Sequence, residues 1–243
     1  RGHDIPRPLT VEPPPARVYH RGECFTFGLT LIGKAQNLLP YLARAVQKMG
    51  KAGMGKGRGQ FKLEMIGEYC PLLDTGRDLM SHNVVRQPTL QVTPNRVHDA
   101  AAHGQPNRIT IELLTPLRLI AADRLVKHPD SVVFIQRLIE RCQSLITYYS
   151  ENDTRPTRAE WLEAMVALKA QAEELTVAYD DTEWIDAWSG SRRRGRYTPI
   201  GGLVGVFRWE GNVESLRPWL LWGQSLHVGK DAVKGNGWYR VMA

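Results

Sequence analysis

The sequence predicts an α+β fold, a ferredoxin-like βαββαβ sandwich in which two β-α-β halves share one antiparallel sheet. One observation is an internal repeat at a constant offset of 178 residues, which relates residues 40–42 to 218–220 and residues 56–61 to 234–239. Each copy joins a Pro-aromatic-Leu motif to a later Lys-Gly-x-Gly loop. The other observation is the apolar pattern around each copy, which has the period of a strand, then of a helix, then of a strand again. A helical insertion separates the two halves.

The first half is expected over residues 23–70. Apolar residues alternate with small or polar ones along 25–31, as in a strand with one buried face. A helix with apolar positions between 38 and 49 follows, and Asn37 is its candidate N-cap. Pro40 then lies in the first turn, where its missing N–H group breaks no helical hydrogen bond. A second alternating run at 61–65 completes the predicted β-α-β unit.

The second half is expected over residues 196–243 and repeats this order. A strand covers about 203–209, and a helix then starts from a Ser215 cap. The glycine-rich loop 227–237 connects this helix to the last strand. The two halves together would leave one sheet face open for a partner.

The insertion between the halves spans residues 71–195. Its first part, 71–107, is polar and proline-rich and predicts a long loop or a loose hairpin. A strand is expected at 109–113, and an amphipathic helix after Pro129. Thr157–Glu160 has the pattern of a capping box and predicts the start of another helix.

Composition excludes some classes of protein. The net charge of +7 favours a polyanionic partner, and no apolar run approaches the length of a membrane-spanning helix. Cys24, Cys70 and Cys142 share no metal-like or redox spacing, so we expect free thiols and a cytoplasmic location. Residues 1–22, rich in Pro and Arg, predict an extended entry segment.

The glycine-rich loops are the candidate sites of phosphate contact. Glycine lets a backbone approach a ligand closely, and flanking cations attract phosphate. Because both loops follow a helix rather than precede one, mononucleotide binding is unfavoured and an RNA backbone fits better. The alternative is that the glycines only make tight helix-to-strand turns, and that the arginine run is a solvated loop. The candidate RNA-binding residues are Lys51, Lys56, Arg58, Arg192, Arg193, Arg194, Lys230, Lys234, Gly229, Gly235 and Gly237.

The C-terminal motif resembles a known family. Residues 226–230 read Leu-His-Val-Gly-Lys, and Gly235-x-Gly237 follows just before the last predicted strand. This spacing is similar to the glycine-rich signature of the CRISPR-associated pre-crRNA-processing endoribonucleases of the RAMP superfamily. The first loop and the segment around Trp184-x-Asp186 resemble the same family. The likeness is weakest at 71–107 and in the helices of the insertion.

The resemblance implies a metal-independent ribonuclease that binds CRISPR repeat RNA and leaves 2′,3′-cyclic phosphate and 5′-hydroxyl ends. Such chemistry needs an acid, a base and a cation, which makes His227 and Lys230 the candidate catalytic residues. His227 stands where the first repeat has Met49, so a packing role is its alternative. No metal or other cofactor is expected.

Members of this family usually carry an N-terminal ferredoxin-like domain that often supplies the active histidine. This chain begins too late to contain that domain whole, so we expect part of the catalytic apparatus to lie outside it. The alternative function is a non-catalytic module that holds repeat RNA within a CRISPR effector or fusion protein. A ferredoxin-like protein–protein adaptor is a third possibility. Other CRISPR effector or adaptation proteins are the expected protein partners.

Overall fold

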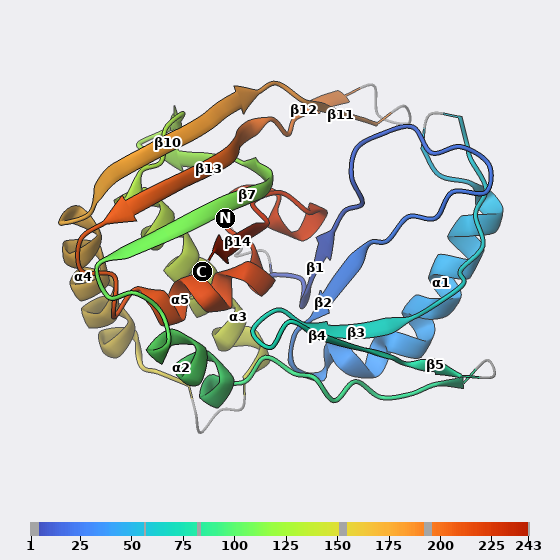
Figure 1. Ribbon diagram of the computed structural model, residues 1–243, viewed down its shortest axis with the longest axis horizontal. Helices are drawn as coiled ribbons and strands as arrows, with labels where there is room; N and C mark the ends of the chain where they lie inside the picture. Colours follow the sequence, from blue (N-terminus) through green and yellow to red (C-terminus); the bar gives the residue numbers. More distant parts are fainter. Residues whose placement is uncertain (1–4, 56, 82–83, 151–154, 192–195, 243) are drawn as a thin grey trace.

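The computed structural model describes residues 5–55, 57–81, 84–150, 155–191 and 196–242, which form two lobes (Figure 1). The fold is α+β with antiparallel sheets. None of the helices in these residues is long and apolar enough to cross a membrane.

The C-terminal lobe is built on a four-stranded antiparallel sheet with the strand order β10-β13-β7-β14. In chain order its elements are β7 (Arg108–Leu117), α3 (Ser131–Tyr149), α4 (Arg158–Glu173), β10 (Thr176–Ile185), β13 (Gly202–Glu210), α5 (Arg217–Leu226) and β14 (Tyr239–Met242). The two central strands, β13 and β7, pair through Phe207 and Ile111. This order is β-α-α-β-β-α-β, with two helices in the first crossover.

The structure corrects the expected pairing of the two halves. The unit β13–α5–β14 matches the second predicted half, but β7, α3, α4 and β10 supply the other half of its sheet. These elements lie in the stretch expected to be an insertion. The strand of the predicted first half, β2 (Gly28–Leu31), pairs instead with β1 (Leu9–Glu12), inside the segment expected to be an extended entry. The 178-residue repeat therefore relates one lobe to the other rather than two halves of one sheet.

The reason lies in the apolar pattern of β7. Every second residue of this ten-residue strand, from Ile109 to Leu117, is buried, whereas the four residues of β2 are only half-buried. At the centre of a sheet, a strand with five buried positions removes more apolar surface from water than a short strand does, and it therefore contributes more to the free energy of folding. The alternating run at 61–65 pairs with no other strand of the described residues and is not a strand.

The N-terminal lobe consists of short elements. They are β1, β2, a 3₁₀ turn (Gly33–Leu38), α1 (Leu39–Ala52), β3 (Gly67–Cys70), β4 (Thr75–Asp78), β5 (Met80–Ser81) and β6 (Val84–Val85). The helix that follows, α2 (Pro94–Ala102), packs against α5 of the C-terminal lobe (Figure 1). Pro40 lies in the first turn of α1 as expected, but Leu38 is the N-cap residue and makes no side-chain cap bond. The 71–107 region contains β4, which pairs with β3, the small hairpin β5–β6, and α2. Two short strands, β8 (Leu119–Ala121) and β9 (Arg124–Val126), form a hairpin after β7, and β11 (Trp188–Ser191) pairs with β12 (Arg196–Pro199).

The core lies between the large sheet and the helices α3, α4 and α5. Phe134 of α3 meets both Trp209 and Tyr239 edge-on, with ring centroids 5.4 and 5.2 Å apart. The predicted helix after Pro129 is confirmed, and Asp130 caps it by accepting a bond from the Val133 amide. The Thr157–Glu160 capping box is also confirmed, with both reciprocal bonds formed.

Residues 5–12 tie the two lobes together. The Thr10 hydroxyl donates to the Ser225 carbonyl of α5 over 2.9 Å, although the two residues are far apart in sequence. The Tyr149 hydroxyl, at the end of α3, donates to the Pro6 carbonyl. From α5, the buried Arg217 guanidinium bonds the Arg108 carbonyl over 2.9 Å at the junction between the lobes. β1, the first strand of the chain, therefore packs beside α5, the last α-helix.

Candidate nucleic-acid interface

The loop 227–237 lies folded against the end of the large sheet. The amides of Lys230 and Gly237 donate to the carbonyls of Arg118 and Pro116, each over 3.0 Å. The Val228 amide donates to Gly237 within the loop. Because these amides already have protein partners, they are not free to bind phosphate.

The three signature glycines allow this close packing. Gly229, Gly235 and Gly237 all have positive φ, and Gly235 and Gly237 are buried. A Cβ on Gly229 would lie 2.6 Å from the Arg118 carbonyl oxygen, and one on Gly237 would overlap the Val228 carbonyl. The geometry favours the alternative in which the glycines make a tight turn. Their contact with RNA stays a prediction.

His227 ends α5 and is fully buried, with a positive φ of 60°. Its ring stacks on Trp238 at 6.2 Å between centroids, and neither ring nitrogen has a hydrogen-bond partner. Burial, with a smaller contribution from the nearby Arg141 charge, lowers the pKa of His227 to about 4, although the backbone of Asn236 and Ala232 acts in the opposite direction. The ring is therefore neutral near pH 7 and reaches no solvent. This position supports the packing alternative, and a catalytic role would require the loop to open.

Arg141 of α3 completes the buried surroundings of His227. Its Nε donates to the Leu226 carbonyl, so it caps the C-terminus of α5, where carbonyls lack helical partners. Its Nη2 has no partner, and burial lowers the pKa of the guanidinium. Arg141 thus fixes Leu226, the last residue of α5, which directly precedes the loop 227–237.

A second group of cations lies where the loop meets the sheet. The Arg118 guanidinium carbon and the Lys127 Nζ lie 5.8 and 5.1 Å from the ring centroid of Trp184, within the range of cation–π attraction. The Arg118 Nη1 also donates to the Gly201 carbonyl over 3.1 Å, and the Trp184 Nε1 donates to Asp186 over 3.0 Å. Lys230 is exposed, and its amide bonds Arg118. We call Arg118, Lys127, Trp184 and Lys230 the Trp184 cluster.

The comparisons with known proteins agree with this geometry. A family model described as CRISPR-associated endoribonuclease Cas6 matches residues 111–239, more than half of the chain and the whole region around the loop. The chain belongs to the Cas6 family. A second model, AF_1859_N, an N-terminal domain, matches residues 1–95. No curated protein is significantly similar to the chain in sequence.

Solved Cas6 structures share the fold. A Cas6 (TTHB231) product complex is 16% identical with a TM-score of 0.60, over 97% of this chain and 82% of the other. Thermus thermophilus Cas6 (TTHB231) is 16% identical with a TM-score of 0.55, over 97% and 79%. A partial Cas6-RT-Cas1–Cas2 complex is 19% identical with a TM-score of 0.62, over 96% of this chain and 38% of that one. At these identities the likeness concerns the fold.

Within this Cas6-family chain, the other predicted cations lie in several places. Lys51 and Arg58 are exposed around the first loop, in the other lobe from Lys230 (Figure 1). Lys234 is exposed and its Nζ lies 2.6 Å from the Asp231 carboxylate, so its charge is already paired. Lys56 and Arg192–Arg194 lie outside the described residues. The structure therefore does not bring the two basic loops together.

Sequence reasoning missed most of the Trp184 cluster. Arg118 and Lys127 come from the two ends of the β8–β9 hairpin, and their nearness to Trp184 depends on the pairing of β7 with β13. Only one signal was available, since Arg118 directly follows the last buried residue of a strand. A cation at a strand end often points to a site at the edge of the sheet.

The exposed histidines of the Cas6-family chain are on loops or short helices. His20, between β1 and β2, is exposed, and its amide donates to Glu23 over 2.6 Å. The neighbouring Arg17 lies 4.2 Å above the Tyr19 ring. Among the described residues, no three His, Cys, Asp or Glu side chains gather closely enough to hold a metal ion.

Proposed function

We propose that this Cas6-family protein binds CRISPR repeat RNA and cleaves pre-crRNA without a metal ion, leaving 2′,3′-cyclic phosphate and 5′-hydroxyl ends. The Trp184 cluster is the observation that carries the proposal. Its half-buried indole packs against the core and carries the cations Arg118 and Lys127 at its ring, and Lys127 and Lys230 are exposed cations for RNA phosphates. The product complexes of two Cas6 relatives support RNA as the ligand.

For catalysis we propose that Lys230 stabilises the charge that develops on the scissile phosphate, because its side chain is exposed and its amide is held by the Arg118 carbonyl. We further propose that the proton transfers need an accessible imidazole, since the buried ring of His227 would have to leave its contact with Trp238. Among the described histidines, His20 is the first to test because it is exposed and follows Arg17 by three residues in the same loop.

We propose that residues 108–242 form a complete ferredoxin-like domain of the RAMP kind and that the N-terminal lobe is a second, shorter domain. Its β-α order through β2 and α1 and the repeat at an offset of 178 residues support this division. Adaptation proteins are proposed partners, since a relative of the same fold occurs in a Cas6-RT-Cas1–Cas2 complex. A role as a non-catalytic repeat-RNA-binding module stays the second candidate function, favoured by the burial of His227.

A cleavage assay on labelled repeat RNA in EDTA tests the proposal. We expect cleavage with a cyclic-phosphate end, slowed at least tenfold in Lys230→Gln and in His20→Ala. If His227→Ala alone abolishes cleavage while its melting temperature and RNA affinity are unchanged, the catalytic assignment moves to His227. Tight, salt-dependent binding of RNA that stays intact would favour the binding module. No salt-dependent RNA binding would reject both functions and leave the adaptor.

A further inference from the structure

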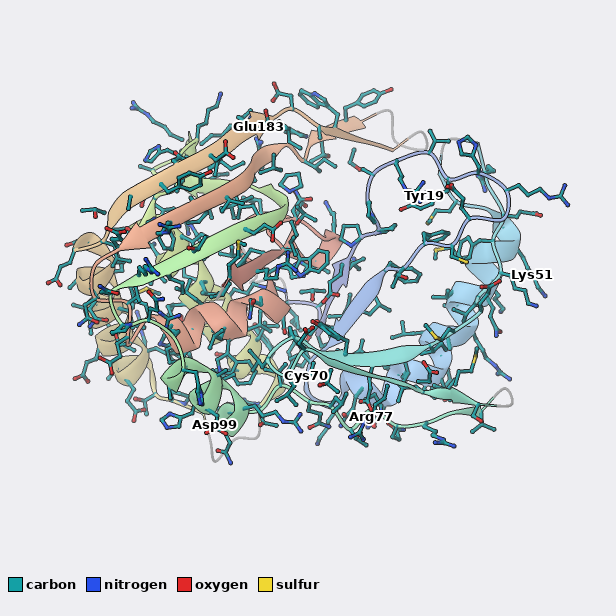
Figure 2. All side chains as sticks on the ribbon, in the orientation of Figure 1. Tyr19, Lys51, Cys70, Arg77, Asp99 and Glu183 are labelled. Atoms are coloured by element: carbon teal, nitrogen blue, oxygen red, sulfur yellow. The ribbon has the colours of Figure 1, made fainter. Side chains whose placement is uncertain are left out.

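Acidic residues are concentrated at one end of this basic protein. Residues 159–191 hold eight of the 25 acidic residues of the chain and one of its 32 basic residues, so this stretch carries a formal charge of −7 and the rest +14. All eight carboxylates are exposed. They lie on α4, on β10 and just beyond it, at the opposite end of the molecule from α1 (Figure 1). Figure 2 shows Glu183 of β10 along the upper edge and Lys51 of α1 at the right-hand end.

Large apolar side chains are exposed among these carboxylates. Helix α4 buries Trp161 and Leu168 against the core, yet Leu162 and Val166 on its other side are 65% and 62% exposed. These two residues are one helical turn apart and therefore share a face. A helix that is apolar on both sides is typical of an element covered on both sides. The outer face of α4 is without a partner in the described residues.

The strand that follows α4 is also open. β10 is the edge strand of the large sheet and pairs only with β13 within the described part of the chain, so its outer backbone groups face away from the sheet. Val177 and Tyr179 on this strand are 47% and 46% exposed. The edge is interrupted by a β-bulge between Val177 and Tyr179, and the Thr182 amide donates to the Asp180 carboxylate over 3.0 Å. The rest of this ten-residue edge, with its exposed apolar side chains, is a template for a further strand.

We propose that the surface formed by α4 and β10 is a docking site for a basic, extended segment of a partner protein. The segment adds a strand to the free edge of β10 and covers Val177 and Tyr179, while its Lys or Arg side chains pair with Asp181 and Glu183. RNA does not fit α4 or the edge of β10 from Val177 to Glu183, because the carboxylates there repel a polyanion. Trp184, the next residue of β10, differs because the cations Arg118 and Lys127 lie over its ring. A second copy of β10 does not fit either, since it would place carboxylates opposite carboxylates. The proposal rests on none of the residues that carry the proposed RNA cleavage.

The surface is tested with two fluorescein-labelled, capped twelve-residue peptides, one alternating lysine with valine and one alternating glutamate with valine. We expect only the lysine peptide to bind, with an affinity that falls as salt rises. Hydrogen exchange should slow in residues 176–185 when it binds, because a new strand protects the edge amides. The double variant Asp181→Asn/Glu183→Gln should weaken binding about fivefold, since it removes two ion pairs.

A matched double variant, Asp78→Asn/Asp99→Asn, removes two exposed carboxylates, one from β4 and one from α2, and should leave peptide affinity unchanged. Equal losses in both variants would mean non-specific attraction and would overturn the proposal. Protection of other segments in place of β10 would do the same. Light scattering of the protein alone tests whether it forms a dimer. A dimer that dissociates in the variant Leu162→Asp would overturn the proposal and assign the surface to a second copy of the chain. Repeat-RNA binding by Asp181→Asn/Glu183→Gln should be no weaker than that of the wild type, whether or not the RNA is cleaved, because the variant removes only charges that repel RNA.

Discussion

The two glycine-rich loops have nearly the same sequence pattern but different structures. The second loop, 227–237, is closed: Gly235 and Gly237 are buried, and its amides bond to Pro116 and Arg118. The tip of the first loop is open, and a Cβ on Gly57 would meet no atom within 4 Å. One pattern therefore supports two roles. In the C-terminal lobe it shapes the protein interior, and in the N-terminal lobe it leaves an exposed basic loop.

Replacing one glycine in each loop should separate these roles most strongly. We expect Gly237→Ala to lower the free energy of unfolding by about 3 kcal/mol or more, because its Cβ would overlap the Val228 carbonyl and its φ is positive. Gly57→Ala should change stability by less than about 0.5 kcal/mol. Urea denaturation of both variants measures the difference. Similar losses in the two variants would show that the second loop is no more closed than the first.

The buried histidine of the second loop should make stability depend on pH. The pKa of His227 is about 4 in the folded protein and about 6.5 when the chain unfolds. The unfolded state thus binds the extra proton between these values. The stabilisation is complete above pH 6.5 and is lost as pH falls, at about 1.4 kcal/mol per unit and about 3 kcal/mol in total.

Comparison with His227→Gln isolates this effect from the titration of carboxylates. We expect the difference in free energy of unfolding between the two proteins to vary with pH from 6.5 to 4 and to be constant above 7. A difference that stays constant over the whole range would mean that the histidine is solvated in the folded state.

The open first loop should contribute electrostatically to RNA binding. Lys51 and Arg58 are exposed and the structure gives neither a salt bridge. If each contacts one phosphate, Lys51→Gln/Arg58→Gln should reduce the slope of log affinity against log salt by about 1.4. Anisotropy titrations of repeat RNA at several salt concentrations measure this slope. An unchanged slope would remove the first loop from the interface.

The smallest effect is expected at Lys234 in the closed loop. Its ammonium already lies 2.6 Å from Asp231, so little of its charge is available to RNA. Lys234→Gln should weaken RNA binding by about twofold or less, and lose at most about 1 kcal/mol of stability with the exposed ion pair. A loss as large as that of the first-loop double variant would show that the Asp231 pair opens when RNA binds.

The elements whose signals are local could be predicted from the sequence. The capping box at Thr157 and the apolar pattern of α3 each depend on residues that are close together in the sequence. The structure has both elements. The unit β13–α5–β14 was also predicted, because strand, helix and loop follow each other directly, but the expected Ser215 cap was wrong: Leu216 is the N-cap of α5 and makes no side-chain cap bond.

The pairing of strands across the chain could not be predicted in the same way. The repeat suggested that β2 belonged to the sheet of β13, but the choice between β2 and β7 depends on how much apolar surface each strand buries. The same limit applied to the site. Arg118 and Trp184 meet only because β7 and β13 pair, whereas the loop of Lys230 was visible from its glycines.

The bond between Thr10 and Ser225 has a consequence for synthesis on the ribosome. β1 emerges early, but the α5 carbonyl and the Gly235 backbone against which it packs emerge more than 200 residues later. At about 5–20 residues per second, its final partner arrives 10 seconds or more after it does. During that time β1 has an exposed edge available to other chains. The docking of β1 is therefore expected to be late during synthesis but not when the complete chain refolds, because both partners are then present from the start.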